Sequence, residues 1–155
     1  MWNQFLAALI LCASNVCIHA LGTYANFLLV LRALKRRSLV TPISALWIML
    51  RLVLILLFLH ALEAAVWAQF YVSRHCFPDS ETAYYYSLVT YTTLGQGDVV
   101  LPRAWRITGA CEAMIGVLLF GWSTAALVAF IHYVRDARVR KYVSTATEKA
   151  PSESN

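Results

Sequence analysis

Three long apolar segments constrain this chain more than any other feature of its sequence. They cover residues 3–31, 43–72 and 104–134 and contain few charged side chains. About 20 apolar residues in a helix are enough to cross a bilayer, so each segment can span with some tilt or with protruding ends. With 60% hydrophobic and only 14% charged residues, the chain differs from ordinary soluble domains. We therefore predict an all-α membrane protein with three transmembrane helices.

The positions of the basic residues predict the orientation of these helices. They follow the first and the third apolar segment, at Arg32, Lys35, Arg36, Arg37, Arg135, Arg138, Arg140 and Lys141. By the positive-inside rule both clusters face the cytoplasm, which leaves the N-terminus outside and the C-terminus inside. Because the charges sit at membrane borders, the formal net charge of +5 does not indicate a nucleic-acid partner. The expected surroundings are a lipid bilayer.

The same features divide the chain into three parts. Residues 1–41 form a first transmembrane helix and a basic loop. A cleavable signal peptide is the alternative, but "MWNQ" carries no positive charge and the apolar run continues past Ala20. Residues 42–135 contain both remaining spans. Residues 136–155 form a short cytoplasmic tail, and the polar composition from Ser144 onward predicts disorder there.

The connection between the second and third spans contains a short helix that cannot cross a membrane. Pro78 ends the preceding element, and residues 80–93 read "SETAYYYSLVTYTT", with Ser80 as the expected N-cap and Glu81 in the first turn. A polar loop follows the helix. A non-spanning helix and an irregular loop between two spans are typical of a re-entrant segment.

The loop at residues 93–98, "TLGQGD", has glycines at alternate positions, Gly95 and Gly97. Glycine adopts left-handed backbone conformations without steric cost, so alternation allows successive carbonyl oxygens to point to one side. Such oxygens replace the water around a dehydrated monovalent cation, and the Thr93 hydroxyl adds another oxygen. One chain supplies one loop, so the predicted site requires four copies.

This segment resembles the filter of the two-helix bacterial potassium channels and their pore-loop relatives, Thr-Val/Leu-Gly-Tyr-Gly-Asp. The resemblance runs from about Ile43 to Val134, with the first span as an addition. It implies a pore domain at residues 42–135 of a homotetrameric, potassium-conducting channel in the plasma (inner) membrane. It implies no enzyme activity and no cofactor other than permeant K⁺. The implied filter comprises Thr93, Leu94, Gly95, Gln96 and Gly97, with K⁺ at the first four.

The resemblance also implies roles for residues around the filter. Residues 80–92 are the expected pore helix, and the expected filter supports are Thr92, Asp98, Tyr85, Tyr86 and Glu112. In the third span, Gly116 occupies the hinge position of the family's inner helix and Gly121 a second glycine position. Close helix packing is an alternative for both glycines. By helical periodicity and the family match, the cavity-facing residues are Val117, Phe120, Thr124 and Val128.

Gln96 stands where the family has tyrosine. The main-chain carbonyl remains, but the aromatic side chain that braces the filter is lost, so a non-selective cation channel or a non-conducting regulatory subunit is the alternative function. We hypothesise that the Gln96 amide forms a hydrogen bond with Tyr85 or Tyr86 instead. The alternative role for these tyrosines is an aromatic belt at the membrane interface.

Ionisable residues inside the spans are functional candidates by default. They are Arg51, His60, Glu63 and Glu112. Glu112 points away from the predicted cavity, so we expect it behind the filter, as a proton-sensitive brace or a structural carboxyl. Glu63 lies at similar depth and could share its polar environment. A single arginine makes no voltage sensor, and we expect Arg51 to reach the headgroups.

Small and polar residues recur every three or four positions in the first span, at Cys12, Asn15, His19, Gly22 and Asn26. This pattern favours a helix-packing seam, with His60 and Glu63 as partners. A metal site from His19 and His60 is not expected, since no ligand spacing motif surrounds them. Cys76 is the cysteine outside the spans, and an unpaired thiol is favoured over an intersubunit disulfide.

Overall fold

The structure is a computed structural model that describes residues 2–35 and 42–149. In chain order the elements are α1 (Trp2–Lys35), α2 (Pro42–Ser73), α3 (Ser80–Tyr91), the 3₁₀-helix η1 (Arg103–Trp105) and α4 (Arg106–Lys149). The described ranges contain no strand. The predicted all-α fold class is confirmed.

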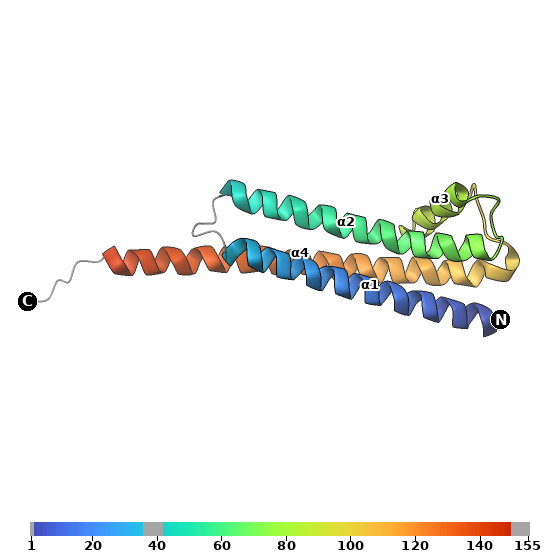
Figure 1. The fold of residues 1–155 in the computed structure, drawn as a ribbon, viewed down its shortest axis with the longest axis horizontal. Coiled ribbons are helices and arrows are strands. Elements are labelled where there is room, and N and C mark those ends of the chain that lie inside the picture. The colour runs from blue at the N-terminus through green and yellow to red at the C-terminus, as the bar shows by residue number, and fades with distance from the viewer. Residues whose placement is uncertain (1, 36–41, 150–155) are drawn as a thin grey trace, which may run out of the picture.

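Three of the helices are long and apolar enough to cross a membrane. The qualifying stretches are Trp2–Arg32, Ile43–Ser73 and Arg103–Tyr133, each of 31 residues. The helices α1, α2 and α4 run side by side along the long axis of the molecule (Figure 1), and each packs against the other two. Large apolar side chains such as Leu9, Leu57 and Leu118 are exposed on their outer faces. The protein is therefore a multi-pass membrane protein.

Local sequence explains where the helices begin and end. Pro42 is the first residue of α2, a position where its missing N–H costs nothing. The chain leaves α2 through His75, whose φ of 53° lies in the left-handed region that commonly ends helices. The N-cap of α3 is Asp79 and not Ser80 as predicted, because the Asp79 carboxylate reaches two groups of Thr82 whereas Ser80 is already helical.

The short helix α3 lies at the end of the bundle where α1 begins (Figure 1), and it packs against α2 and α4. The hydrophobic core at this end includes Trp67 and Tyr71 of α2, Tyr91 of α3 and Leu119 of α4. A second core, which includes Val30, Leu56 and Phe130, lies elsewhere between α1, α2 and α4. Aromatic packing therefore fixes the short helix against two spans.

Helix α4 continues through Lys149 and projects beyond the other helices in Figure 1. The predicted disorder from Ser144 is wrong for residues 144–149. Extending an existing helix by one residue needs no new nucleus, so a polar sequence can continue a helix that it would not start. The remainder of the predicted tail, residues 150–155, lies outside the described residues.

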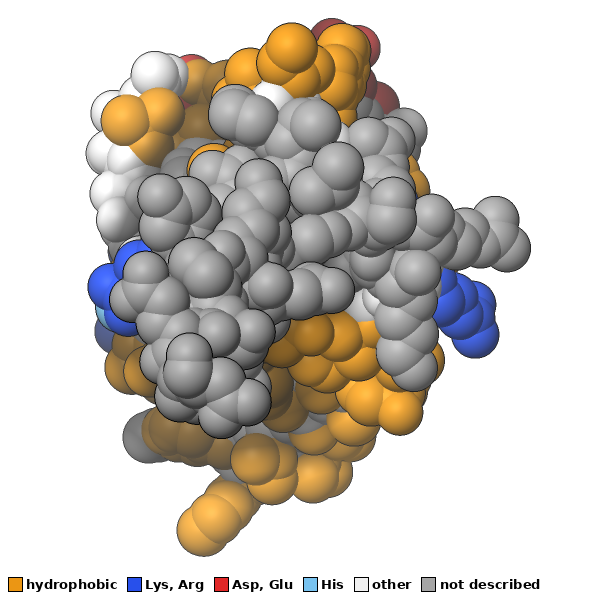
Figure 2. Space-filling view, turned by 90° about the vertical axis from the view of Figure 1, so that its left-hand side faces the viewer, with side chains coloured by type: hydrophobic (Ala, Val, Ile, Leu, Met, Phe, Trp, Pro, Cys, Tyr) orange, Lys and Arg blue, Asp and Glu red, His pale blue; other side chains and the backbone are white. Residues whose placement is uncertain are grey.

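Figure 2 looks onto the end of the molecule opposite to α3. Basic side chains lie at the edge of this end, and apolar side chains surround its perimeter. Arg32 and Arg135 are exposed. The predicted basic loop with Arg36 and Arg37 lies outside the described residues. The described basic residues thus agree with a border between lipid and water at this end.

Candidate functional site

The site is built on the two ends of α3. At its start, Asp79 Oδ1 accepts a hydrogen bond from the Thr82 amide at 2.7 Å, and Oδ2 accepts one from the Thr82 hydroxyl at 2.9 Å. These bonds to the charged form lower the pKa of Asp79. At its end, the Thr92 amide donates to Leu88 O at 3.1 Å. The helix is thus capped on both sides, which fixes where the following loop starts.

The main chain of the 93–98 loop turns its first three amides toward α3. The Leu94 and Gly95 amides both donate to Val89 O, at 2.9 and 3.2 Å, and the Thr93 amide donates to Thr90 O at 2.9 Å. Within residues 2–35 and 42–149, no hydrogen bond ends on the carbonyl oxygens of residues 93–97. These oxygens are therefore available to a ligand.

The backbone of the loop alternates in the predicted manner. Thr93, Gly95 and Gly97 have φ values of 60°, 58° and 80°, all in the left-handed region. Glycine adopts this region freely, but a β-branched residue such as Thr93 does so at a cost. Residues 92–98 are exposed in the single chain. The loop is therefore held in a strained, repeating conformation with nothing from its own chain packed over it.

The Gln96 side chain bonds to Tyr85, one of the two tyrosines proposed for this role. The Tyr85 hydroxyl lies 2.5 Å from Gln96 Oε1 and 2.8 Å from Asp98 Oδ2. A hydroxyl has one proton to donate and can also accept, so a half-turn of the Gln96 amide satisfies both contacts together. The hydrogen bond to Asp98 raises the pKa of Tyr85, which keeps this hydroxyl neutral. Tyr85 thus links α3 to Gln96 and Asp98, the residues before and after Gly97.

Tyr86 lies elsewhere, behind the loop. Its ring packs against Tyr71 at 5.5 Å and Phe77 at 5.1 Å between ring centroids, and its hydroxyl lies against Gly109 of α4. It therefore supports α3 through aromatic contacts and not through Gln96.

Glu112 is fully buried behind α3, as its helical direction predicts. Its Oε2 accepts a hydrogen bond from the Tyr71 hydroxyl at 2.8 Å. Glu63 has other hydrogen-bond partners, which lie on α1, α2 and α3. The two acids therefore have no hydrogen-bond partner in common among the described residues, and a shared polar environment stays a prediction.

Gly116 and Gly121, the two glycines of α4 to which the sequence assigns a role, differ in their surroundings. A Cβ at Gly116 would lie 2.1 Å from the Tyr91 carbonyl oxygen, whereas a Cβ at Gly121 would meet no atom within 4 Å. Gly116 thus allows close contact between α4 and the last residue of α3. This geometry supports the packing alternative for Gly116, and α4 is helical through both glycines.

The proposed cavity residues lie on the open side of α4. Val117, Thr124 and Val128 are exposed in the single chain, and the Thr124 hydroxyl donates to Phe120 O at 2.9 Å. Phe120 is half-buried because its ring packs on His60, with 4.3 Å between centroids. The face that carries them is thus uncovered, except at Phe120.

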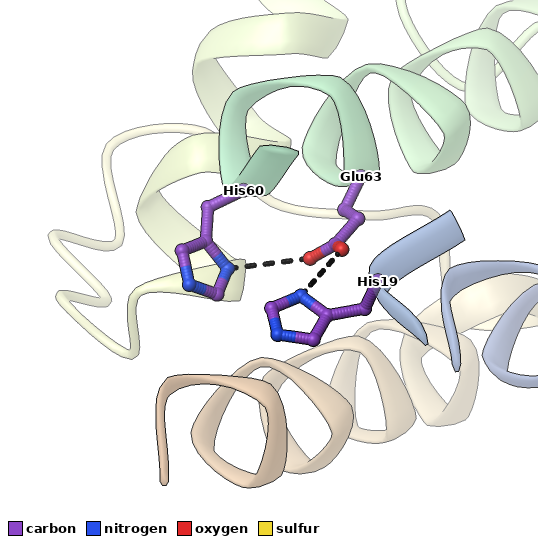
Figure 3. Close-up of side chains that lie close together, drawn as sticks. All are labelled: His19, His60 and Glu63. Carbon is purple, nitrogen blue, oxygen red and sulfur yellow. Dashed lines mark hydrogen bonds and ion pairs between the residues drawn. The ribbon is translucent and has the colours of Figure 1, made fainter. Parts of the chain in front are cut away.

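A buried polar cluster joins all four α-helices below the loop. His19 of α1 and His60 of α2 both contact the Glu63 carboxylate, as Figure 3 shows. Tyr91 of α3 donates to the same carboxylate, and Ser123 of α4 contacts both histidines. The sequence pattern predicted His19, His60 and Glu63 as partners. Tyr91 and Ser123 were missed, because a tyrosine and a serine in apolar surroundings give no periodic signal.

Two further expectations concern Arg51 and Cys76. The Nε and Nη2 atoms of Arg51 are covered by protein and have no hydrogen-bond partner in the described part of the chain. Its reach to the headgroups stays a prediction. Cys76 is a free, half-buried thiol whose pKa is raised by burial. A disulfide between subunits stays a prediction.

The part of the chain that forms most of α2, α3, the 93–98 loop and much of α4 matches a known family. A family model described as "Ion channel" matches residues 48–133, more than half of the chain. The protein belongs to this ion channel family. No curated protein and no solved structure shows significant similarity. The matched region contains the whole 93–98 loop and the residues predicted to support it. Helix α1 lies outside the matched region.

Proposed function

We propose that this protein is a homotetrameric monovalent cation channel that conducts K⁺ through a filter made by residues 93–97. The observation that carries the proposal is the alternation of left-handed backbone at Thr93, Gly95 and Gly97, in a loop whose first three amides bond to α3. With these amides turned toward α3, the carbonyl oxygens of residues 93–96 are left to replace the hydration shell of a cation. No enzymatic step is involved.

Four chains are proposed because one loop provides oxygens on one side of an ion only. The exposed state of residues 92–98, Val117 and Thr124 supports this assembly, since a membrane protein does not leave irregular backbone facing lipid. In the tetramer the four loops surround a common axis and the exposed face of α4 lines the cavity on the cytoplasmic side. The bundle end that carries α3 faces outward, so the N-terminus is outside and the C-terminus cytoplasmic, in the plasma (inner) membrane.

Potassium is the proposed ion despite Gln96. The family tyrosine braces the filter through its side chain, and here Tyr85 holds Gln96 and Asp98 on either side of Gly97. The brace is polar and near the outer end of the filter, so it limits widening of the carbonyl ring. Selectivity depends on the number and field strength of those carbonyls, which the substitution leaves in place.

Potassium flux from liposomes that contain the purified protein tests the proposal. Wild type is expected to release K⁺, and Gly95→Ala to lose most of this flux, because alanine is strained at a φ of 58°. The control is His132→Gln, an exposed residue at the far part of α4, which is expected to conduct like wild type. Absence of flux from wild-type tetramers would favour a non-conducting regulatory subunit, and equal K⁺ and Na⁺ flux would favour a non-selective channel.

A further inference from the structure

The side chains of His19, His60 and Glu63 form a cluster that is almost completely buried. This cluster takes no part in the proposed conduction path. His19 and Glu63 have no exposed surface and His60 is 7% exposed. Ionisable groups in a membrane span are costly and require a compensating partner. In Figure 3 both imidazole rings point their Nδ1 atoms at the Glu63 carboxylate, one ring coming from α1 and one from α2.

The spacing of these atoms suits a small transition-metal ion. His19 Nδ1 lies 2.9 Å from Glu63 Oε1, and His60 Nδ1 lies 3.2 Å from Oε2. One ligand atom from each of the three residues falls within 4.8 Å of the others. Ligands about 2.0–2.2 Å from a tetrahedral Zn²⁺ are separated from each other by roughly 3.4 Å. Side-chain movements of about 1 Å would therefore admit the ion between the three donors.

The Nε2 atoms of His19 and His60 are already placed as a metal site requires. A histidine that binds metal through Nδ1 carries its proton on Nε2 and donates it to a second group, which fixes the ring. Here Ser123 Oγ lies 2.9 Å from His60 Nε2 and 3.3 Å from His19 Nε2. A hydroxyl oxygen has two lone pairs, so Ser123 can accept from both rings at once. Without a metal, Ser123 has only one proton to give to two neutral acceptors.

Tyr91 provides a fourth donor on the same side. Its hydroxyl lies 3.1 Å from His60 Nδ1 and donates to the Glu63 carboxylate. When a divalent ion binds, the phenol proton is released to bulk water, because metal ligands bind in their deprotonated form. The two positive charges of Zn²⁺ are then balanced by one carboxylate and one phenolate. The loaded site carries no net charge, which suits its depth in the membrane.

We propose that His19, His60, Glu63 and Tyr91 bind one Zn²⁺ ion per chain, with Ser123 orienting both imidazoles. Two imidazoles with oxygen ligands suit zinc rather than Mg²⁺ or Ca²⁺, which prefer oxygen alone. The ion joins α1, α2 and the last residue of α3. The absence of a ligand motif in the sequence is explained by the origin of the donors in three separate helices.

Metal content of the purified full-length protein tests the proposal without any measurement of conduction. Protein produced with ZnCl₂ in the medium, washed with chelator and then dialysed against ZnCl₂, is expected to retain one zinc per chain by elemental analysis. His60→Gln and Glu63→Gln are expected to lose this zinc. The matched control His132→Gln is exposed and outside the cluster, and it is expected to retain the wild-type amount.

Ser123→Ala is the variant that separates metal binding from folding, because it removes no ligand. A loss of 10- to 100-fold in zinc affinity is expected from the removal of the group that orients the rings. Cobalt substitution provides a second readout, with visible absorption bands typical of tetrahedral Co²⁺ expected in wild type. Wild-type protein that holds no zinc after dialysis would overturn the proposal and leave a hydrogen-bonded cluster only, as would equal zinc content in wild type, His60→Gln and Glu63→Gln.

Discussion

Gly116 of α4 lies directly against the main-chain carbonyl of Tyr91, the last residue of α3. A Cβ at Gly116 would approach that oxygen to 2.1 Å, well inside van der Waals contact. The contact sets how closely the spanning helix α4 approaches the point where the 93–98 loop begins. The position of the loop therefore depends on the absence of a side chain at Gly116.

Gly116→Ala is expected to destabilise the protein by about 1–3 kcal/mol or more, because the obstructing atom is backbone and cannot rotate away. Thermal unfolding of the protein in detergent measures this effect. The comparison variant is Gly121→Ala, whose added methyl group meets no atom of its own chain within 4 Å. Equal melting temperatures for Gly116→Ala and wild type would show that α4 does not press on α3.

Tyr85→Phe is expected to reduce the K⁺ over Na⁺ permeability ratio, because it removes the hydroxyl that reaches Gln96 and Asp98. Reversal potentials measure the ratio. Tyr24→Phe serves as the control, since Tyr24 is 61% exposed on α1. In the opposite direction, Gln96→Tyr is expected to leave or raise the ratio, and a sharp loss there would refute the bracing role of Gln96.

Tyr71→Phe is expected to lower the free energy of unfolding by about 1–3 kcal/mol, since it removes the hydrogen bond to a buried carboxyl. Glu112 Oε1 already lacks a hydrogen-bond partner among the described residues. In the variant, Glu112 Oε2 loses its hydrogen bond from Tyr71 as well. Chemical or thermal unfolding checks the change. A variant as stable as wild type would mean that Tyr71 contributes nothing to the support of Glu112.

The N-cap of α3 is expected to weaken in acid. The bonds from Thr82 lower the pKa of Asp79 below its unfolded value of about 3.9. A lowered folded pKa means that the contribution is complete above about pH 5 and is lost as the pH falls through the folded pKa. Asp79→Asn keeps a capping side chain that does not titrate. Melting temperatures of the two proteins should converge in acid, and parallel curves from pH 7 to 3 would contradict the assignment.

The sequence predicted the features that depend on local rules. Apolar length located the three spans, and the spacing of Gly95 and Gly97 predicted the left-handed backbone because glycine alone favours it. Helical direction placed Glu112 behind α3. Partner choice between helices could not be predicted in the same way. Ser123 and Tyr91 reach the histidine cluster through contacts between helices, and the cap at Asp79 depends on side-chain reach that sequence spacing does not resolve.

Single-channel recording with K⁺ on one side of the membrane and Na⁺ on the other tests the central claim most directly. If carbonyl oxygens of residues 93–96 from four chains form the filter, wild type should show unitary currents whose reversal potential favours K⁺, and Gly95→Ala should abolish them. Unitary K⁺-selective currents that persist unchanged in Gly95→Ala, or wild-type tetramers that pass no current at all, would contradict the account.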